Sequence, residues 1–148
     1  MSTTPPFALS SSPRLYSDVI QSEAQDYVGY CKDIVVANEA ADTTYVIGQV
    51  LGKVTSSGKY KALKETATDG SQNFAAIYVG QPADTGEYRP NVANMVATVD
   101  QEVVAFTRGP ATVGKAYLVF GTGSISPTQK AAVYAQMLAA GIKLLDQV

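Results

Sequence analysis

The stretch Gly48-Gln49-Val50-Leu51-Gly52-Lys53-Val54-Thr55 decides how this chain folds. With the residues before it, it forms the clearest strand pattern of the sequence, from Tyr45 to Thr55. Gly48 and Gly52 interrupt that pattern, and glycine inside a strand is typical of a bulge, a bend or a close backbone approach. A turn at residues 56–58 follows. The stretch therefore predicts bent β structure, and it contains no group suited to catalysis.

Further short strands are predicted on both sides of this stretch. They cover residues 33–36, 59–63, 74–79, 94–106 and 116–120, and residues 142–148 return as a terminal strand. Within the fourth of these, Gln101-Glu102 resembles a turn or a bulge. Asp69-Gly70 is a second turn, and residues 81–90, rich in Gly, Pro and Asp, read as a loop. The chain has no regular repeat and no β-α-β alternation, which argues against a parallel α/β fold.

The C-terminal part is different, because it predicts a helix over about residues 127–140. Ser126 is suited to cap it, Pro127 occupies the first helical position, and Gln129 is placed to complete a capping box. Gly141 is a natural stop after the last turn. The predicted fold class is therefore mainly β with one C-terminal helix (α+β).

The composition limits the classes of protein to which this chain can belong. A chain of 148 residues with 46% hydrophobic and 16% charged residues is a single domain, and so low a charge suits a protein that buries surface against partners. The net charge of −2 does not indicate nucleic-acid binding. The N-terminus lacks the pattern of a signal peptide, and no apolar run could span a bilayer. We therefore expect no membrane partner, and we expect synthesis in the cytoplasm.

Charge is distributed unevenly along the chain. Residues 1–42 hold two basic and six acidic side chains, for a net of −4, and residues 43–148 hold nine basic and seven acidic ones, for a net of +2. Two interpretations stay open: solvated faces of one domain, or an acidic segment that meets basic patches on another surface.

No residue pattern predicts catalysis, a cofactor or a metal. The chain has no histidine and a single cysteine, which excludes a Ser-His-Asp triad and a structural zinc site; Cys31 is interpreted as a partly buried, inert thiol. The glycines near Lys59 do not have P-loop spacing. The carboxylate pairs Asp100/Glu102 and Asp84/Glu87 are interpreted as solvated loop charges. We therefore predict that the protein is not an enzyme.

The N-terminal residues 1–15 are predicted to form a flexible arm. The first twelve are rich in Ser, Thr and Pro, and they hold too little apolar surface to offset the entropy of ordering. Pro5 and Pro6 favour extended backbone. Phe7 and Leu9 lie two apart, on one side of an extended segment, where they could anchor the arm on the edge of a partner's sheet. The alternative, a passive tail, stays open on the residues alone.

A resemblance to a known family rests on the order of these segments. They are Ser22-Glu23-Ala24, residues 29–36, Gly48 to Thr55, Gly58-Lys59-Tyr60, Thr68-Asp69-Gly70-Ser71, Ala75-Ala76-Ile77, and the capped helix with Gly141-Ile142. In this order, over residues 16–148, the chain resembles the phage lambda-type head decoration proteins. The resemblance is weak between residues 81 and 108.

The resemblance implies a compact β-barrel or β-clip-like decoration domain over residues 16–148, with residues 1–15 as a capsid-binding arm. It further implies a homotrimer on the outer capsid surface of the virion, whose arms bind the major capsid protein, and which cements the expanded shell against genome pressure. The capsid-binding residues inferred from the arm are Pro5, Pro6, Phe7 and Leu9. The alternative is a carbohydrate- or receptor-binding β module of a virion fibre or a cell surface, which the nine tyrosines leave open.

Overall fold

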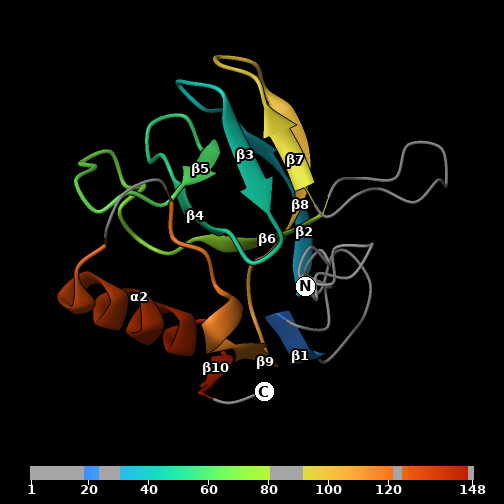
Figure 1. The fold of residues 1–148 in the computed structure, drawn as a ribbon, viewed down its shortest axis with the longest axis vertical. Coiled ribbons are helices and arrows are strands. Elements are labelled where there is room, and N and C mark those ends of the chain that lie inside the picture. The colour runs from blue at the N-terminus through green and yellow to red at the C-terminus, as the bar shows by residue number, and fades with distance from the viewer. Residues whose placement is uncertain (1–18, 24–30, 81–91, 122–124, 147–148) are drawn as a thin grey trace, which may run out of the picture.

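A computed structural model describes residues 19–23, 31–80, 92–121 and 125–146 of the chain. A closed five-stranded barrel lies between a small two-stranded sheet at one end and a three-stranded sheet with a helix at the other (Figure 1). The strands are β1 (Ile20–Glu23), β2 (Lys32–Ala37), β3 (Thr43–Val46), β4 (Val50–Lys53), β5 (Tyr60–Ala62), β6 (Ala76–Gly80), β7 (Val92–Met95), β8 (Gln101–Phe106), β9 (Ala111–Gly114) and β10 (Ile142–Leu145). The helix is α2 (Pro127–Ala139). The predicted fold class, mainly β with one C-terminal helix, is confirmed.

The barrel closes in the order β2-β5-β4-β6-β8. Its longest pairing is antiparallel, between β2 and β8, and runs from Lys32 opposite Phe106 to Ala37 opposite Gln101. Barrel closure pairs both edges of every strand, which removes the exposed edges on which other β chains could assemble. The predicted strands at residues 33–36, 59–63 and 74–79 correspond to β2, β5 and β6.

The stretch around Gly48 is two strands rather than the single strand predicted over residues 45–55. Gly48 has φ +95° between β3 and β4, and a Cβ there would lie 2.3 Å from the carbonyl oxygen of Tyr117. At Gly52, inside β4, a Cβ would lie 2.1 Å from the carbonyl oxygen of Ser71. Both glycines therefore admit a neighbouring backbone where a side chain has no room, which is the physical reason for the interruption.

Two hydrophobic clusters lie on opposite faces of the barrel strands. Along β6, Ile77 and Val79 belong to the cluster shared with α2 and the three-stranded sheet, whereas Ala76 and Tyr78 belong to the cluster toward β3 and β7. This explains why β6 is apolar at successive positions: both of its faces are buried. Cys31 is fully buried in the first cluster.

Two predictions about the second half of the chain are wrong. Gln101 and Glu102 begin β8 instead of forming a turn, and the chain reverses just before them, at Thr98, which has φ +61°. The Asp42 carboxylate stabilises that reversal by accepting a hydrogen bond from the Ala97 amide at 2.8 Å. The predicted strand at residues 116–120 begins instead as a 3-10 turn at Lys115–Tyr117, and only an isolated bridge joins Val119 to Gln49.

The C-terminal helix begins as predicted and differs in one contact. The Ser126 hydroxyl accepts a hydrogen bond from the Gln129 amide at 3.2 Å. The Gln129 side chain does not complete the capping box; it donates to the carbonyl oxygen of Gln72 at 2.8 Å. Val133 and Met137, four residues apart, bury one face of the helix against the first cluster. After Gly141, β10 pairs in parallel with β9, so the predicted terminal strand is present over Ile142–Leu145.

Candidate functional site

The residues predicted to bind a capsid, Pro5, Pro6, Phe7 and Leu9, lie outside the described residues, as does the whole predicted arm, residues 1–15. Their role and the boundary of the arm therefore stay predictions. What the structure describes is the point at which this segment joins the domain. Val19, fully buried, and Ile20, 4% exposed, are the first described residues, and both belong to the hydrophobic core.

The first described strand, β1, is held by strand pairing along its length and by an ion pair at its far end. β1 pairs antiparallel with β9, from Ile20 opposite Val113 to Glu23 opposite Ala111. At its far end the carboxylate of Glu23 accepts a hydrogen bond from the Lys32 ammonium at 3.4 Å, and both side chains are only 10% exposed. This ion pair joins the three-stranded sheet to barrel strand β2. β1 is therefore tied to the core of the domain both by its strand pairing and by this ion pair.

The same three-stranded sheet carries an apolar hollow on its other edge. The strand order is β1-β9-β10, so β10 is the edge strand opposite β1. The hollow, of about 290 Å³, lies between β10 and the last turns of α2. We call it the α2–β10 hollow; it is lined by Tyr134, Ala135, Leu138, Ile142, Lys143 and Leu144.

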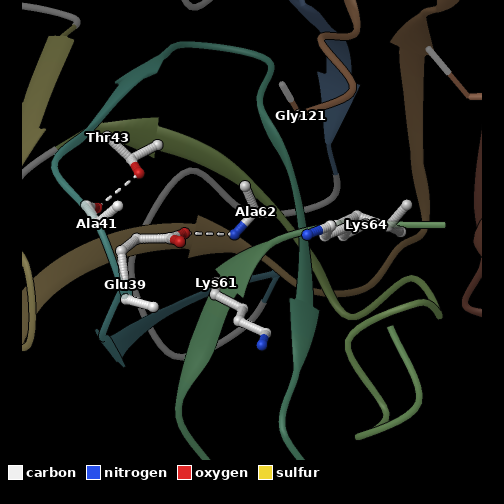
Figure 2. Close-up of a pocket in the computed structure, with 9 residues that line it drawn as sticks. Glu39, Ala41, Thr43, Lys61, Ala62, Lys64 and Gly121 are labelled. Atoms are coloured by element: carbon white, nitrogen blue, oxygen red, sulfur yellow. Dashed lines mark hydrogen bonds between the residues drawn. The ribbon is translucent and has the colours of Figure 1, made fainter. Parts of the chain in front are cut away.

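A second pocket, of about 220 Å³, surrounds the carboxylate of Glu39 (Figure 2). One carboxylate oxygen accepts two hydrogen bonds, from the hydroxyl of Tyr45 at 2.5 Å and from the amide of Ala62 at 2.6 Å. Burial, followed by the hydrogen bond and the charge of Glu39, raises the pKa of Tyr45 well above its usual value. The Tyr45 hydroxyl therefore stays a proton donor at neutral pH, and this contact joins β3, β5 and the loop after β2. Nothing in the sequence pattern singled out this contact, because Ala62 lies 23 residues from Glu39 and the two residues meet only in the folded barrel.

The Glu39 pocket offers no catalytic arrangement. Two lysines, Lys61 and Lys64, also line the pocket. Lys61 forms an ion pair with Asp69 at 2.6 Å, and Figure 2 shows its ammonium pointing away from Glu39. A general acid or base needs a partner within hydrogen-bond reach of a substrate, and Glu39 is already occupied by a structural contact. We interpret the Glu39 contact as structural.

Other carboxylates are also held by local contacts. The Lys61 hydrogen bond, followed by two from Ser71, holds the pKa of Asp69 well below its usual range. Asp69 thereby closes the predicted turn at residues 69–70, since it accepts from the Ser71 amide at 3.0 Å and from the Ser71 hydroxyl at 2.6 Å. Likewise, hydrogen bonds from Ser126 lower the pKa of Glu65.

The carboxylate pairs considered for acid-base chemistry do not form a site in the described residues. Asp100 is exposed; its carboxylate accepts a hydrogen bond from the Asn38 side chain at 2.6 Å and forms an ion pair with Lys59 at 2.9 Å. These contacts, first Lys59 and then Asn38, lower its pKa. Glu102 is an exposed residue of β8. The other pair, Asp84 and Glu87, lies outside the described residues.

Two further features, a metal-binding cluster and a membrane-spanning helix, are absent from the part of the chain that the structure describes. Residues 19–23, 31–80, 92–121 and 125–146 contain no group of three or more side chains of the types that ligate metals. In the same ranges, no helix combines the length and the apolar character that crossing a membrane requires.

Comparison with known proteins connects this fold to a family. The sequence model of the bacteriophage lambda head decoration protein D family matches residues 9–142 of the 148. No curated protein matches the chain. The match covers the predicted root of the arm, the barrel, the three-stranded sheet and the helix. The chain therefore belongs to the bacteriophage lambda head decoration protein D family, and its role is that of a structural protein of the phage capsid.

Proposed function

We propose that the protein binds the outer surface of the expanded phage shell as a homotrimer and cements it against the pressure of the packaged genome. Residues 1–15 serve as the arm that pairs with strands of the major capsid protein, with Phe7 and Leu9 as its apolar anchors. The observation that carries this proposal is the family match over residues 9–142.

The anchoring of β1 supports the mechanical part of the proposal. An arm that holds a shell under pressure must be attached to a part of the domain that does not unravel. Val19 and Ile20 are buried, β1 is paired with β9, and the Glu23–Lys32 contact joins it to the barrel. Pulling on the arm would therefore load an antiparallel strand pair and a nearly buried ion pair.

Trimer formation would make modest contacts sufficient. Three arms on one closed trimer bind with avidity, because the second and third arms attach at a high effective concentration. Binding that is selective for the expanded shell stabilises it by about 3–4 kcal/mol per site at concentrations hundreds of times the dissociation constant. Neither step requires a catalytic group.

The rival function, a carbohydrate- or receptor-binding module, would draw support from a cluster of exposed aromatic side chains. Five of the nine tyrosines are described: Tyr45 and Tyr78 are buried, and Tyr60, Tyr117 and Tyr134 are half-buried. None of these five is fully exposed, so the described residues do not favour this alternative.

The test is cosedimentation of the purified protein with expanded and unexpanded shells, using the full chain and a variant that lacks residues 1–13. We expect the full chain to pellet with expanded shells only. The shortened variant should keep the melting temperature of the domain and lose stable attachment. Equal attachment of both chains would contradict the role of the arm, and attachment of neither chain to expanded shells would contradict the proposed function as a whole.

A further inference from the structure

The carboxylate of Glu39 is a buried charge with one oxygen atom left unused. The residue is 9% exposed. Its Oε1 atom accepts both of the hydrogen bonds described above, whereas no described residue donates a hydrogen bond to Oε2 or forms an ion pair with Glu39. Oε2 is not one of the fully enclosed side-chain atoms that lack a partner, so it is open to the pocket that Glu39 lines. Because a desolvated charge is costly without a counter-charge, the open oxygen indicates a place for a cation.

The pocket supplies a second kind of oxygen acceptor. The Thr43 hydroxyl donates its proton to the carbonyl oxygen of Ala41 at 2.9 Å, so the lone pairs of the hydroxyl oxygen are free to accept. Both residues line the pocket, and in the view of Figure 2 they lie on the same side of it as Glu39, with Lys64 on the other side. A carboxylate oxygen together with a hydroxyl oxygen suits a positively charged group that carries several N–H donors.

The size of the pocket and the use of Oε1 favour a primary ammonium over other cations. A volume of about 220 Å³ is smaller than sites for drug-sized ligands, so the pocket suits a single side chain or a small amine. A guanidinium binds most strongly as a fork on two carboxylate oxygens, and Oε1 already holds two hydrogen bonds. An ammonium is a compact charge with three N–H donors, which can be shared between Oε2 and the Thr43 oxygen.

The two lysines that line the pocket do not supply this cation. The ammonium of Lys61 is bound to Asp69 at 2.6 Å and points away from Glu39 (Figure 2). Lys64 is an exposed residue, so water and salt screen its charge, and no ion pair joins it to Glu39 in the described part of the chain. The buried charge of the pocket is therefore negative.

We propose that the Glu39 pocket binds a primary alkylammonium, either the end of a lysine side chain of a neighbouring protein or a free amine. The ammonium donates to Oε2 of Glu39 and to the hydroxyl oxygen of Thr43, and the Tyr45 and Ala62 contacts to Oε1 stay in place. This site goes beyond the proposed function and does not rest on it.

The experiment is a nuclear magnetic resonance titration of the full chain with n-butylammonium chloride. The backbone amide of Ala62 reports on the site, because it donates to the Glu39 carboxylate. Tetramethylammonium chloride at the same concentration is the comparison compound, since it carries the same charge without an N–H donor. A lysine blocked by amides at both ends is the third probe, and it distinguishes a lysine of a protein from a free amine.

Three variants test which residues bind the ammonium. Glu39→Gln keeps an oxygen for the Tyr45 and Ala62 hydrogen bonds and replaces Oε2 by an amide that donates. Thr43→Val removes the hydroxyl oxygen and keeps a β-branched side chain. The matched control is Glu102→Gln, which removes the same charge from an exposed position of β8.

We expect n-butylammonium to shift the Ala62 resonance in a saturable manner, and tetramethylammonium to leave it unchanged. Glu39→Gln should weaken binding at least about tenfold, which is the factor that a hydrogen bond to a charged group accounts for, and Thr43→Val should weaken it less. Glu102→Gln should bind within about twofold of the unmodified protein.

An equal response to the two cations would overturn the inference, as would equal affinity of the Glu39→Gln and Glu102→Gln variants. If Glu39→Gln does not fold, the comparison of the two cations and the Thr43→Val variant decide the question, and unchanged affinity in Thr43→Val would then overturn it. Tighter binding of the blocked lysine than of n-butylammonium assigns the pocket to a lysine of a protein, and equal or weaker binding assigns it to a free amine.

Discussion

Two buried tyrosines in contact with each other provide a sharp test of the energetics of this fold. Tyr45 and Tyr78 are both fully buried in the same cluster, and their ring centroids are 5.6 Å apart. The hydroxyl of Tyr45 donates to the carboxylate of Glu39 at 2.5 Å. The hydroxyl of Tyr78 is buried and has no hydrogen-bond partner among the described residues. The same substitution, tyrosine to phenylalanine, should therefore have different effects at two neighbouring positions.

The expected magnitudes follow from these contacts. A hydrogen bond to a charged group contributes about 1.5–3 kcal/mol, so Tyr45→Phe should lower the free energy of unfolding by about 2 kcal/mol. Glu39 keeps its bond from the Ala62 amide, which limits the loss. Tyr78→Phe removes a hydroxyl that was desolvated without compensation, and the ring packing stays. It should leave the free energy of unfolding unchanged or raise it by up to about 1 kcal/mol.

The assay is urea unfolding followed by far-ultraviolet circular dichroism, at one fixed protein concentration, because association shifts apparent stability. For a chain of this length, about 2 kcal/mol corresponds to a fall in melting temperature of about 4–8 °C. The double variant should show additive changes only if the two hydroxyl groups do not share a partner. Equal losses at both positions, or a larger loss for Tyr78→Phe, would refute this account of the cluster.

Three further predictions concern the arm, the barrel and the response to pH. Replacing Phe7 and Leu9 with Asp should abolish stable attachment to expanded shells in a pelleting assay and leave the melting temperature unchanged; an earlier melt would place these residues in the fold. Gly52→Ala places a Cβ 2.1 Å from the carbonyl oxygen of Ser71, which is too close for two atoms that are not bonded. It should lower the free energy of unfolding in urea by about 2 kcal/mol or more, and a neutral effect would contradict the close approach. Burial raises the pKa of Tyr78 to about 12, so its proton stabilises the folded state fully below pH 10, the ordinary tyrosine value, and that stabilisation is lost as the pH rises from about 10 to about 12. Unfolding curves should therefore show stability falling over this range, by at most about 1.4 kcal/mol per pH unit for this group, and less steeply in Tyr78→Phe.

Elements that depend on neighbours in the chain could be predicted from the sequence. The helix over Pro127–Ala139 follows from a cap, a proline and a spacing of apolar residues that all lie within one segment. The turn at Asp69 is likewise closed by a side chain two residues from its partner. Such contacts cost little chain entropy because their residues are close in the sequence, so local sequence patterns predict them without knowledge of the fold.

The candidate site is less accessible to such reasoning. The composition of residues 1–15 indicates an arm, and the order of the segments indicates the family. The α2–β10 hollow gives no signal in the sequence, because exposed Leu138 looks like any apolar residue of an amphipathic helix. Only the packing of α2, with Val133 and Met137 against the core, leaves Leu138 outside.

The sequence by itself determined the fold class, the position of the helix, the glycine-interrupted β structure from Gly48 onward and, because the chain has no histidine, the impossibility of a histidine-based triad. Only the tertiary structure decided that β9 lies between β1 and β10, so that the first described strand and the strand after the helix share one sheet. It also decided that Gly48 and Gly52 admit the backbone of Tyr117 and Ser71. The physical reason is the same in each case, because these contacts join residues that are distant in the chain. A local pattern can indicate that a close contact exists at a position, but it cannot identify the distant residue that makes the contact.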